Sequence, residues 1–508
     1  MAILWITEAV PIPMTAMIPL WTFPMLGVLS TGDLTEMYMQ QTNMMFLGGL
    51  IVTIAIEYSG FHERMALRAL LLVGVSEKWL MLGFMCITMF MSMWISNTAT
   101  TAVMIPVVEA VLWELYKPTE ESGKNAGKNP SREIPSGLSM VDSEMDNVHT
   151  GPAEDVVVAS ENIRAFKRAR NIILCSVAYS ANIGGTGSLT GTGPNLVLKG
   201  ILDDHFNHAT PLNFASWLMF NVPGMLICVF LAWAFLLLQN GPLQKFCYGR
   251  PVASVANART TEETNDAGDR SKNARNILRK KYEDLGPITF HEAAVFVLFV
   301  TMVLLWQVET VLLRHETFTA NNKRYRPKSS YKALLTWAAV HEKMPWGVLI
   351  LIGGGFALSE ATQRSGLSNE VGEALSFLGR LPPAIILFSV TLATSFITEV
   401  TSDTAVSSIL IPILIKLSSN LRLNPLYLTL PCAVSCSFAF MLPAATPPNA
   451  LVYSAGQMRT SEMIRHGFFL NIFCVVVLNL MALLLGGPVL GMDAFPEWAE
   501  PANTTSNV

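Results

Sequence analysis

The sequence predicts an all-α membrane protein that crosses the bilayer several times, and three observations support this prediction. First, 51% of the 508 residues are hydrophobic and only 14% are charged, whereas an ordinary soluble domain has about 25% charged residues. Second, the apolar residues form long runs. Residues 467–490 contain no Asp, Glu, Lys or Arg, and a helix of about 20 such residues crosses a bilayer core. Third, polar stretches separate the runs, as loops separate membrane spans.

The order of apolar and polar segments predicts how the chain is organised. Residues 2–28 are apolar and predict a membrane helix at the very start. Basic residues such as Lys167 and Arg279 flank the first two polar stretches and place both loops in the cytoplasm. In chain order we expect membrane helices at 1–115, a polar cytoplasmic loop at 116–170, helices at 171–240, a second polar cytoplasmic loop at 241–289, helices at 290–420 and 421–490, and an extracellular tail at 491–508.

Asn503 begins the only Asn-x-Thr sequon of the chain, in the polar tail. This tripeptide predicts a glycosylation site and hence an extracellular C-terminus. A chance tripeptide explains it equally well on sequence alone.

Charge and motif content exclude several classes of function. The chain has 34 Lys and Arg against 38 Asp and Glu, a formal net charge of −4, so no nucleic-acid partner is expected from bulk positive charge. It contains neither an H-E-x-x-H motif nor a C-x-x-C pair, and no enzyme is predicted. Six of the seven cysteines lie in apolar stretches, which is typical of small core residues rather than disulfides.

An internal repeat relates the two halves of the chain. Gly48 and Gly354 differ by 306, as do Ser96 and Ser402 within the segments FMSMWISNTAT and FITEVTSDTAV. One gap-free offset over this distance is hard to reach by chance and predicts two related halves. A second pair follows, because aligning the Pro-Asn ends of GTGSLTGTGPN and SFAFMLPAATPPN matches Thr192 with Thr446.

These repeated motifs interrupt apolar runs with residues that favour the ends of helices. Ser, Asn and Thr at 96–100 bond to their own backbone, and prolines at 194, 447 and 448 forbid a continuous helix. Freed N–H groups at a helix start suit a carboxylate, whereas freed carbonyls and hydroxyls suit Na⁺. A duplicated interruption indicates a transporter site. A polar contact between helices is the simpler alternative.

The sequence resembles the divalent anion/sodium symporter family, the SLC13-type sodium-coupled dicarboxylate and citrate carriers. The resemblance implies inverted repeats, each with a re-entrant hairpin and an unwound helix. It also implies a transport domain that moves like an elevator against a dimerising scaffold domain. The hairpins would lie within 1–115 and 290–420, and the unwound helices within 171–240 and 421–490. The motifs that carry the resemblance are SNTAT (96–100), IGGTGSLTGTGPNLVL (183–198), PWGVLILIGGGFAL (345–358) and CSFAFMLPAATPPNALVY (436–453).

The resemblance also implies the residues of the site. One sodium ion would be held by Ser92, Ser96, Asn97 and Gly191, and another by Thr398, Thr401, Asp403 and Ala445. The carboxylates of the substrate would meet Asn97, Thr98, Thr192, Ser402, Thr404 and Thr446. Gly354 would leave room for a bulkier anion such as citrate.

The expected function is therefore uptake of di- or tricarboxylates such as succinate or citrate, driven by Na⁺ as the coupling ion. We expect a homodimer in the lipid bilayer of the plasma membrane. Asp403 stands where the first motif has Asn97, so it is either a stronger Na⁺ ligand or a proton carrier. Two alternatives remain open. Without the family's first helix, and with a polar stretch at 314–340, the chain could be a truncated, non-transporting isoform. A sodium-independent carboxylate exchanger is the other.

Overall fold

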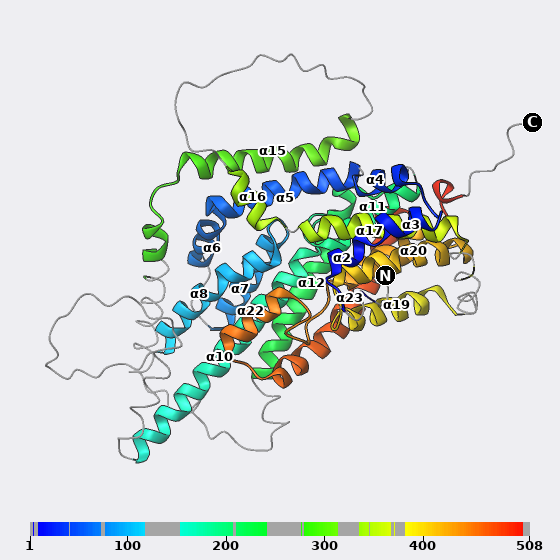
Figure 1. The fold of residues 1–508 in the computed structure, drawn as a ribbon. Helices are drawn as coiled ribbons and strands as arrows, with labels where there is room; N and C mark the ends of the chain where they lie inside the picture. The colour runs from blue at the N-terminus through cyan, green and yellow to red at the C-terminus, as the bar shows by residue number, and fades with distance from the viewer. Residues whose placement is uncertain are drawn as a thin grey trace, which may run out of the picture.

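Every regular element in the described part of the chain is a helix, and no strand occurs among those residues. The computed structural model describes residues 4, 9–39, 41–72, 77–116, 153–206, 210–240, 276, 279–312, 335–344, 346–366, 370 and 381–500. The all-α prediction is confirmed for these ranges. The helices (Figure 1) are α2 (Ile12–Met17), α3 (Pro19–Met25), α4 (Thr31–Tyr38), α5 (Gln41–Ser59), α6 (Phe61–Leu72), α7 (Glu77–Ser92), α8 (Asn97–Tyr116), α10 (Ala153–Gly185), α11 (Gly193–His205), α12 (Phe214–Asn240), α15 (Phe290–Leu312), α16 (Trp337–Lys343), α17 (Trp346–Arg364), α19 (Pro383–Ile397), α20 (Asp403–Asn420), α21 (Pro425–Ser435), α22 (Pro447–Gly456), α23 (Thr460–Leu490) and η3 (Glu497–Ala499).

Four long apolar stretches of the chain are each divided into two helices. The breaks lie at the motifs that the sequence singles out, where Ser, Thr, Asn, Gly and Pro oppose a continuous helix. They separate α7 from α8 at 93–96, α10 from α11 at 186–192, α19 from α20 at 398–402, and α21 from α22 at 436–446.

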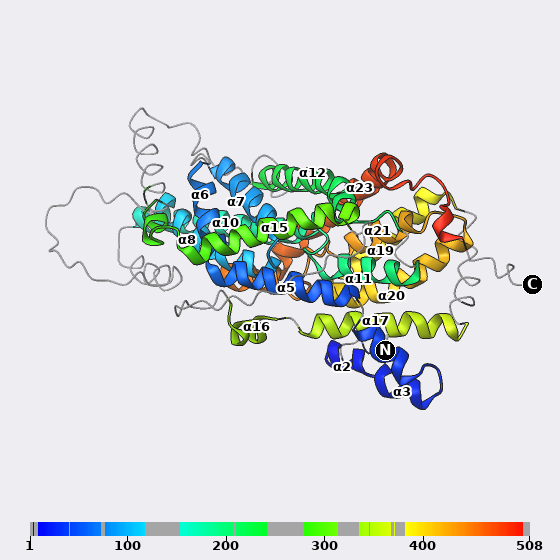
Figure 2. The same ribbon diagram turned by 90° about the horizontal axis from the view of Figure 1, so that it is seen from above.

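The predicted membrane helix at 2–28 is wrong for the described residues of that range. Two short helices, α2 and α3, take its place, and Pro19 begins the second of them. Pro19 lacks an N–H donor, so the helix is interrupted between α2 and α3. Together with α4 these helices lie on the outer side of α17 (Figure 2).

The predicted loop at 116–170 is too long, because α10 already begins at Ala153. Ala, Glu, Arg and Lys are frequent between 153 and 170, and these strong helix formers extend the helix beyond its apolar part. Within the second predicted loop, 241–289, residues 279–284 are helical. Residues 117–152 and 241–275, and the tail with Asn503, lie outside the described residues.

Two pairs of helices, α7–α8 and α19–α20, are each joined at a break like the arms of a hairpin. They lie toward opposite ends of the molecule (Figure 1). Helices α7 and α8 both pack against α10, and α8 also packs against α22, whereas α20 packs against α21 and α11. Helices α10–α11 and α21–α22 are the two broken helices, one in each half. Each hairpin pair therefore contacts the broken helix of its own half and that of the other half. Helices α5 and α17, which carry the repeated glycine motif, run in opposite directions (Figures 1 and 2).

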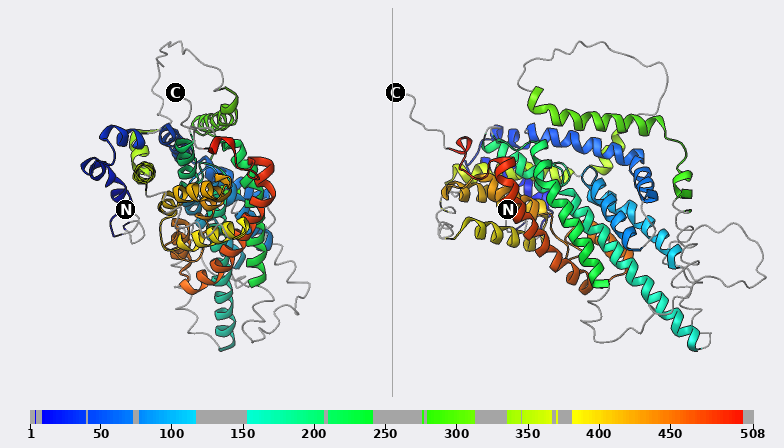
Figure 3. Two further views of the ribbon diagram at one scale, coloured as in Figure 1. Left: turned by 90° about the vertical axis from the view of Figure 1, so that its right-hand side faces the viewer. Right: turned by 180° about the vertical axis from the view of Figure 1, so that it is seen from behind.

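Helices α12 and α23 lie side by side along one flank (Figure 3). Among the described helices, Phe214–Gln239 and Thr460–Leu490 are long and apolar enough to cross a membrane, and the other apolar helices are shorter. Large apolar side chains on this flank are exposed, with Met219 and Leu484 each 63% accessible. A surface of this kind fits lipid better than water.

Candidate substrate and sodium site

Four helices begin at the four breaks. Asn97 begins α8, Gly193 begins α11, Asp403 begins α20 and Pro447 begins α22. The first N–H groups of each helix lack partners within it, so each start carries about half a positive charge. The residues that precede α11 and α22, Thr192 and Thr446, make no capping hydrogen bond with their side chains. Their hydroxyls are therefore free for other partners.

Close contacts bring three of the four helix starts together. A Cβ built on Gly185, the last residue of α10, would lie 2.6 Å from Thr192 Cγ2 and 2.7 Å from Asn97 Oδ1. A Cβ on Gly193 would collide with the hydroxyl of Thr404 at the start of α20. Glycine is thus required where the first break meets both hairpin turns.

Hydrogen bonds connect the two broken helices and join the start of α22, the fourth helix start, to the other three. Ser437 Oγ donates to Thr192 Oγ1 over 3.3 Å, and Asn182 Nδ2 donates to Thr446 Oγ1 over 3.0 Å. Four of the seven predicted substrate residues are joined by these contacts. We call the joined set the central cluster: Asn97, Asn182, Gly185, Thr192, Gly193, Thr404, Ser437 and Thr446.

A buried asparagine holds each break in shape, and the sequence analysis did not assign this role. Asn195 Nδ2 donates to the carbonyls of Gly185 and Ser188 at 3.2 and 2.9 Å. Asn449 Nδ2 donates to those of Ala439 and Leu442 at 2.9 and 3.1 Å. In both halves the partners lie ten and seven residues before the asparagine. The repeated Pro-Asn dipeptide was the signal for these two residues.

The predicted first sodium site is built from neutral oxygens. Ser92 Oγ lies 2.7 Å from Ala181 O and also bonds to Asn97 Oδ1. Gly191 packs so closely on the Gly185 carbonyl that a Cβ would collide with it. The donor set fits Na⁺, a hard cation that prefers oxygen ligands. Ser96 instead accepts a bond from Ala99 N and caps α8.

The predicted second sodium site lies at the turn between α19 and α20. The hydroxyl of Thr398 donates to Thr394 O or Ser395 O, at 3.1 and 3.0 Å, and that of Thr401 donates to Ile397 O at 2.9 Å. Because these hydroxyls give their protons to the backbone, their lone pairs remain available to a cation. Asp403 Oδ1 accepts a bond from Thr404 N at 2.6 Å.

Glu399 connects this turn to the second break. Its carboxylate is 3% exposed and accepts bonds from the backbone N–H groups of Phe440, Met441 and Leu442 at 2.7–3.0 Å. It also accepts one from Asn471 Nδ2 of α23 at 2.7 Å. A buried acid in a membrane protein suggests a functional role. In the structure Glu399 fixes the segment that carries Ala445 and Thr446.

Comparison with known proteins identifies the family. The profile of the sodium:sulfate symporter transmembrane region matches residues 1–492. This chain belongs to that symporter family. Human Na⁺/dicarboxylate cotransporter 3 is 35% identical over 545 residues, 98% of this chain and 89% of that protein. Rabbit solute carrier family 13 member 2 is 38% identical, over 99% of this chain and 91% of that protein. The rat Na⁺/citrate cotransporter is 35% identical, over 98% and 91%.

Family membership shows that the chain lies in a membrane and transports a solute, which its apolar helices alone do not establish. The symporter is an integral membrane transporter and not an enzyme. The predicted relationship to sodium-coupled carriers of dicarboxylates and citrate is confirmed.

Not every predicted site residue of the symporter joins the central cluster. Among the described residues, no side-chain hydrogen bond joins Ser96, Thr98 or Ser402 to it, and Ala445 has no polar side chain. A Cβ on Gly354 would lie 2.6 Å from Ala16 O, so this glycine lets α17 approach α2. The next glycine, Gly355, is the one that faces α20, because successive residues of a helix point in different directions. These contacts do not support the role predicted for Gly354 in admitting a bulky anion.

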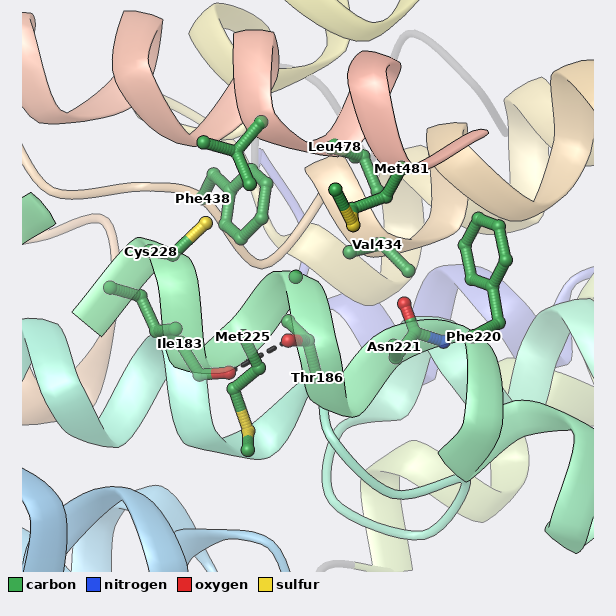
Figure 4. A pocket seen from close by; sticks show the side chains of 12 residues that line it. Ile183, Thr186, Phe220, Asn221, Met225, Cys228, Val434, Phe438, Leu478 and Met481 are labelled. Atoms are coloured by element: carbon green, nitrogen blue, oxygen red, sulfur yellow. Dashed lines mark hydrogen bonds between the residues drawn. The ribbon is translucent and has the colours of Figure 1, made fainter. Parts of the chain in front are cut away.

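The symporter also has an apolar crevice between α10, α12, α21 and α23 (Figure 4). Its polar lining side chains include Thr186, which donates to Ile183 O at 2.7 Å, and Asn221. With its hydroxyl already bonded to the helix, Thr186 is a weak partner for an anion. The crevice is therefore a poor site for a carboxylate. The other labelled residues that line it are Phe220, Met225, Cys228, Val434, Phe438, Leu478 and Met481.

Proposed function

We propose that this symporter couples the uptake of a di- or tricarboxylate, such as succinate or citrate, to the entry of several Na⁺ ions. The observation that carries the proposal is the junction of four helix starts in one cluster of hydroxyl and amide side chains. At about half a charge each, four starts supply roughly two positive charges. That charge matches a substrate with two carboxylates.

Sodium completes the charge balance of the proposed site. The central cluster contains no Lys or Arg, so the helix starts and bound Na⁺ provide the positive charge near the substrate. Na⁺ bound at Ser92 and Asn97 would also fix the Asn97 side chain for the substrate. Ordered sodium ions would therefore raise the affinity for the anion, which is the linkage that coupled transport requires.

We further infer inverted repeats in which α7–α8 and α19–α20 are re-entrant hairpins and the two broken helices are unwound at the site. The opposite directions of α5 and α17 support this inference. In this proposal the hairpins and broken helices move together against a scaffold formed by α2–α6 and α15–α17. The scaffold also forms a homodimer in the plasma membrane.

Uptake of radiolabelled succinate and citrate, with Na⁺ replaced by choline, tests the proposed function. We expect saturable uptake of at least one of them in Na⁺ and only background uptake in choline. Undiminished uptake in choline would favour a sodium-independent exchanger. Background uptake of both substrates in Na⁺, with the symporter present at the cell surface, would indicate a non-transporting isoform.

Replacing Asp403 by Asn tests the charge at the second sodium site. We expect uptake to persist, because the amide oxygen still binds Na⁺. An ion pair at 4 Å gains about 4 kcal/mol at an effective dielectric near 20, partly offset by desolvation. The Na⁺ concentration for half-maximal uptake should therefore rise about tenfold. At saturating Na⁺ the KM for succinate should fall, because a negative charge near the anion is removed.

Asp33→Asn is the matched control, since Asp33 pairs with Arg364 at the surface over 3.2 Å. We expect it to leave both parameters unchanged. If Asp403→Asn abolishes the pH dependence of uptake without altering Na⁺ activation, Asp403 carries a proton and is no sodium ligand.

A further inference from the structure

The two threonines at the breaks, Thr192 and Thr446, are each hydrogen-bonded by the opposite half of the chain. Asn182 of the first half donates to Thr446 at 3.0 Å, and Ser437 of the second half donates to Thr192 at 3.3 Å. The threonines differ by 254 in residue number. At that offset Asn182 corresponds to residue 436 and Ser437 to residue 183, so the two donors occupy neighbouring positions of the repeat.

These crossed bonds leave the protons of both threonine hydroxyls available to a ligand. A hydroxyl has one proton and two lone pairs. When Thr446 accepts a bond from the amide of Asn182, one lone pair is occupied and its own proton is free to be donated elsewhere. Neither threonine caps its own helix with its side chain. Both hydroxyls are thereby arranged as donors, which is what a carboxylate substrate needs.

Asn182 is well placed to hold this arrangement rigidly. It is 1% exposed, and its Nδ2 also lies 3.3 Å from Asn449 Oδ1. Asn449 in turn holds the second break through the carbonyls of Ala439 and Leu442. One buried side chain of α10 thus fixes both the threonine and the asparagine of the other half.

We propose that Asn182 and Ser437 are positioning residues for transport. Each orients the threonine of the opposite half so that both hydroxyls donate to one bound dicarboxylate. The proposal rests on the proposed function, and it adds two residues that contact the substrate only through their threonines. It also provides a contact through which substrate bound at the threonine of one half affects the other half.

A double-mutant cycle on the KM for succinate tests this role, with uptake normalised to the amount of symporter at the cell surface. The variants are Asn182→Ala, Thr446→Val and the double variant. We expect each single variant to raise KM at least about tenfold, the size of one lost hydrogen bond to a charged group. The double variant should be no worse than Thr446→Val alone. Maximal velocity and half-maximal Na⁺ should stay near wild-type values.

The hydrogen bond from Ser437 to Thr192 provides an independent test with a smaller change of side chain. Ser437→Ala removes a single oxygen atom, and we expect a rise in KM of about threefold, consistent with the longer bond. Ser437→Thr retains the hydroxyl and should restore the wild-type KM. This pair keeps the test decisive if Asn182→Ala fails to reach the surface.

The possible results separate the two proposals. If Thr446→Val and Thr192→Val leave KM unchanged, the proposed substrate site is wrong. If Thr446→Val raises KM but Asn182→Ala and Ser437→Ala do not, the site stands and the positioning role is overturned. Effects of Asn182→Ala and Thr446→Val that multiply in the double variant would also overturn it.

Discussion

Asn97→Ala is expected to reduce sodium-driven uptake of succinate and citrate at least about 100-fold while the symporter still reaches the cell surface. Asn97 Oδ1 bonds to Ser92 in the proposed sodium site, and Asn97 also flanks Gly185 beside Thr192. One side chain would therefore serve both the ion and the anion. A hydrogen bond to a charged group contributes about 1.5–3 kcal/mol, and two such losses multiply in the rate. Uptake per surface symporter measures the effect.

Asn221→Ala is the matched control for this variant. Asn221 lines the apolar crevice, and its Nδ2 lies 3.4 Å from Trp217 O of its own helix. The chemical change is the same, at a buried position outside the central cluster, so we expect uptake near the wild-type level. Normal sodium-dependent uptake by Asn97→Ala would remove Asn97 from the site.

Glu399→Ala is expected to cause the largest loss of stability among the changes considered. The carboxylate accepts bonds from three consecutive backbone N–H groups and from Asn471. Removing the acceptor leaves these buried N–H donors unpaired, and each unsatisfied buried donor costs about 1–3 kcal/mol. We expect little symporter at the surface and a lower unfolding temperature after extraction in detergent.

Two comparisons define what the Glu399 result means. Glu57→Ala makes the same substitution at a side chain that pairs with Lys343 at the surface, where ion pairs contribute little, and should leave the unfolding temperature unchanged. Glu399→Gln places an N–H₂ group among N–H donors and should also be unstable. An unfolding temperature equal to wild type for both Glu399 variants would mean that the carboxylate does not hold the second break.

The breaks and the candidate site residues on them were predictable, because their signals are local. The prolines beside Thr192 and Thr446 lie in the first turn of a new helix, where a missing N–H costs nothing, and so mark the start of α11 and α22. The constant offsets of 306 and 254 then mark the matching positions in the two halves. Proline also explains the error at the N-terminus, where an apolar run of sufficient length became α2 and α3.

The contacts between the halves were not predictable from one sequence. Asn182 and Thr446 are 264 residues apart, and Ser437 and Thr192 are 245 apart. No local pattern specifies which polar side chain of one half reaches a threonine of the other. The same limit applies to Glu399, whose partners lie 41–72 residues away. It also applies to Gly354, whose neighbour is α2 and not the central cluster.

The most direct test of sodium-coupled transport uses purified symporter in sealed proteoliposomes. An inward Na⁺ gradient is imposed, and the uptake of labelled succinate and citrate is compared with uptake in equal K⁺ or choline on both sides. We expect the Na⁺ gradient to drive a transient accumulation of at least one substrate above its equilibrium level, and Asn97→Ala to abolish that accumulation. Uptake that proceeds equally without Na⁺, or that never exceeds equilibrium under the gradient, would contradict sodium-coupled transport by this site.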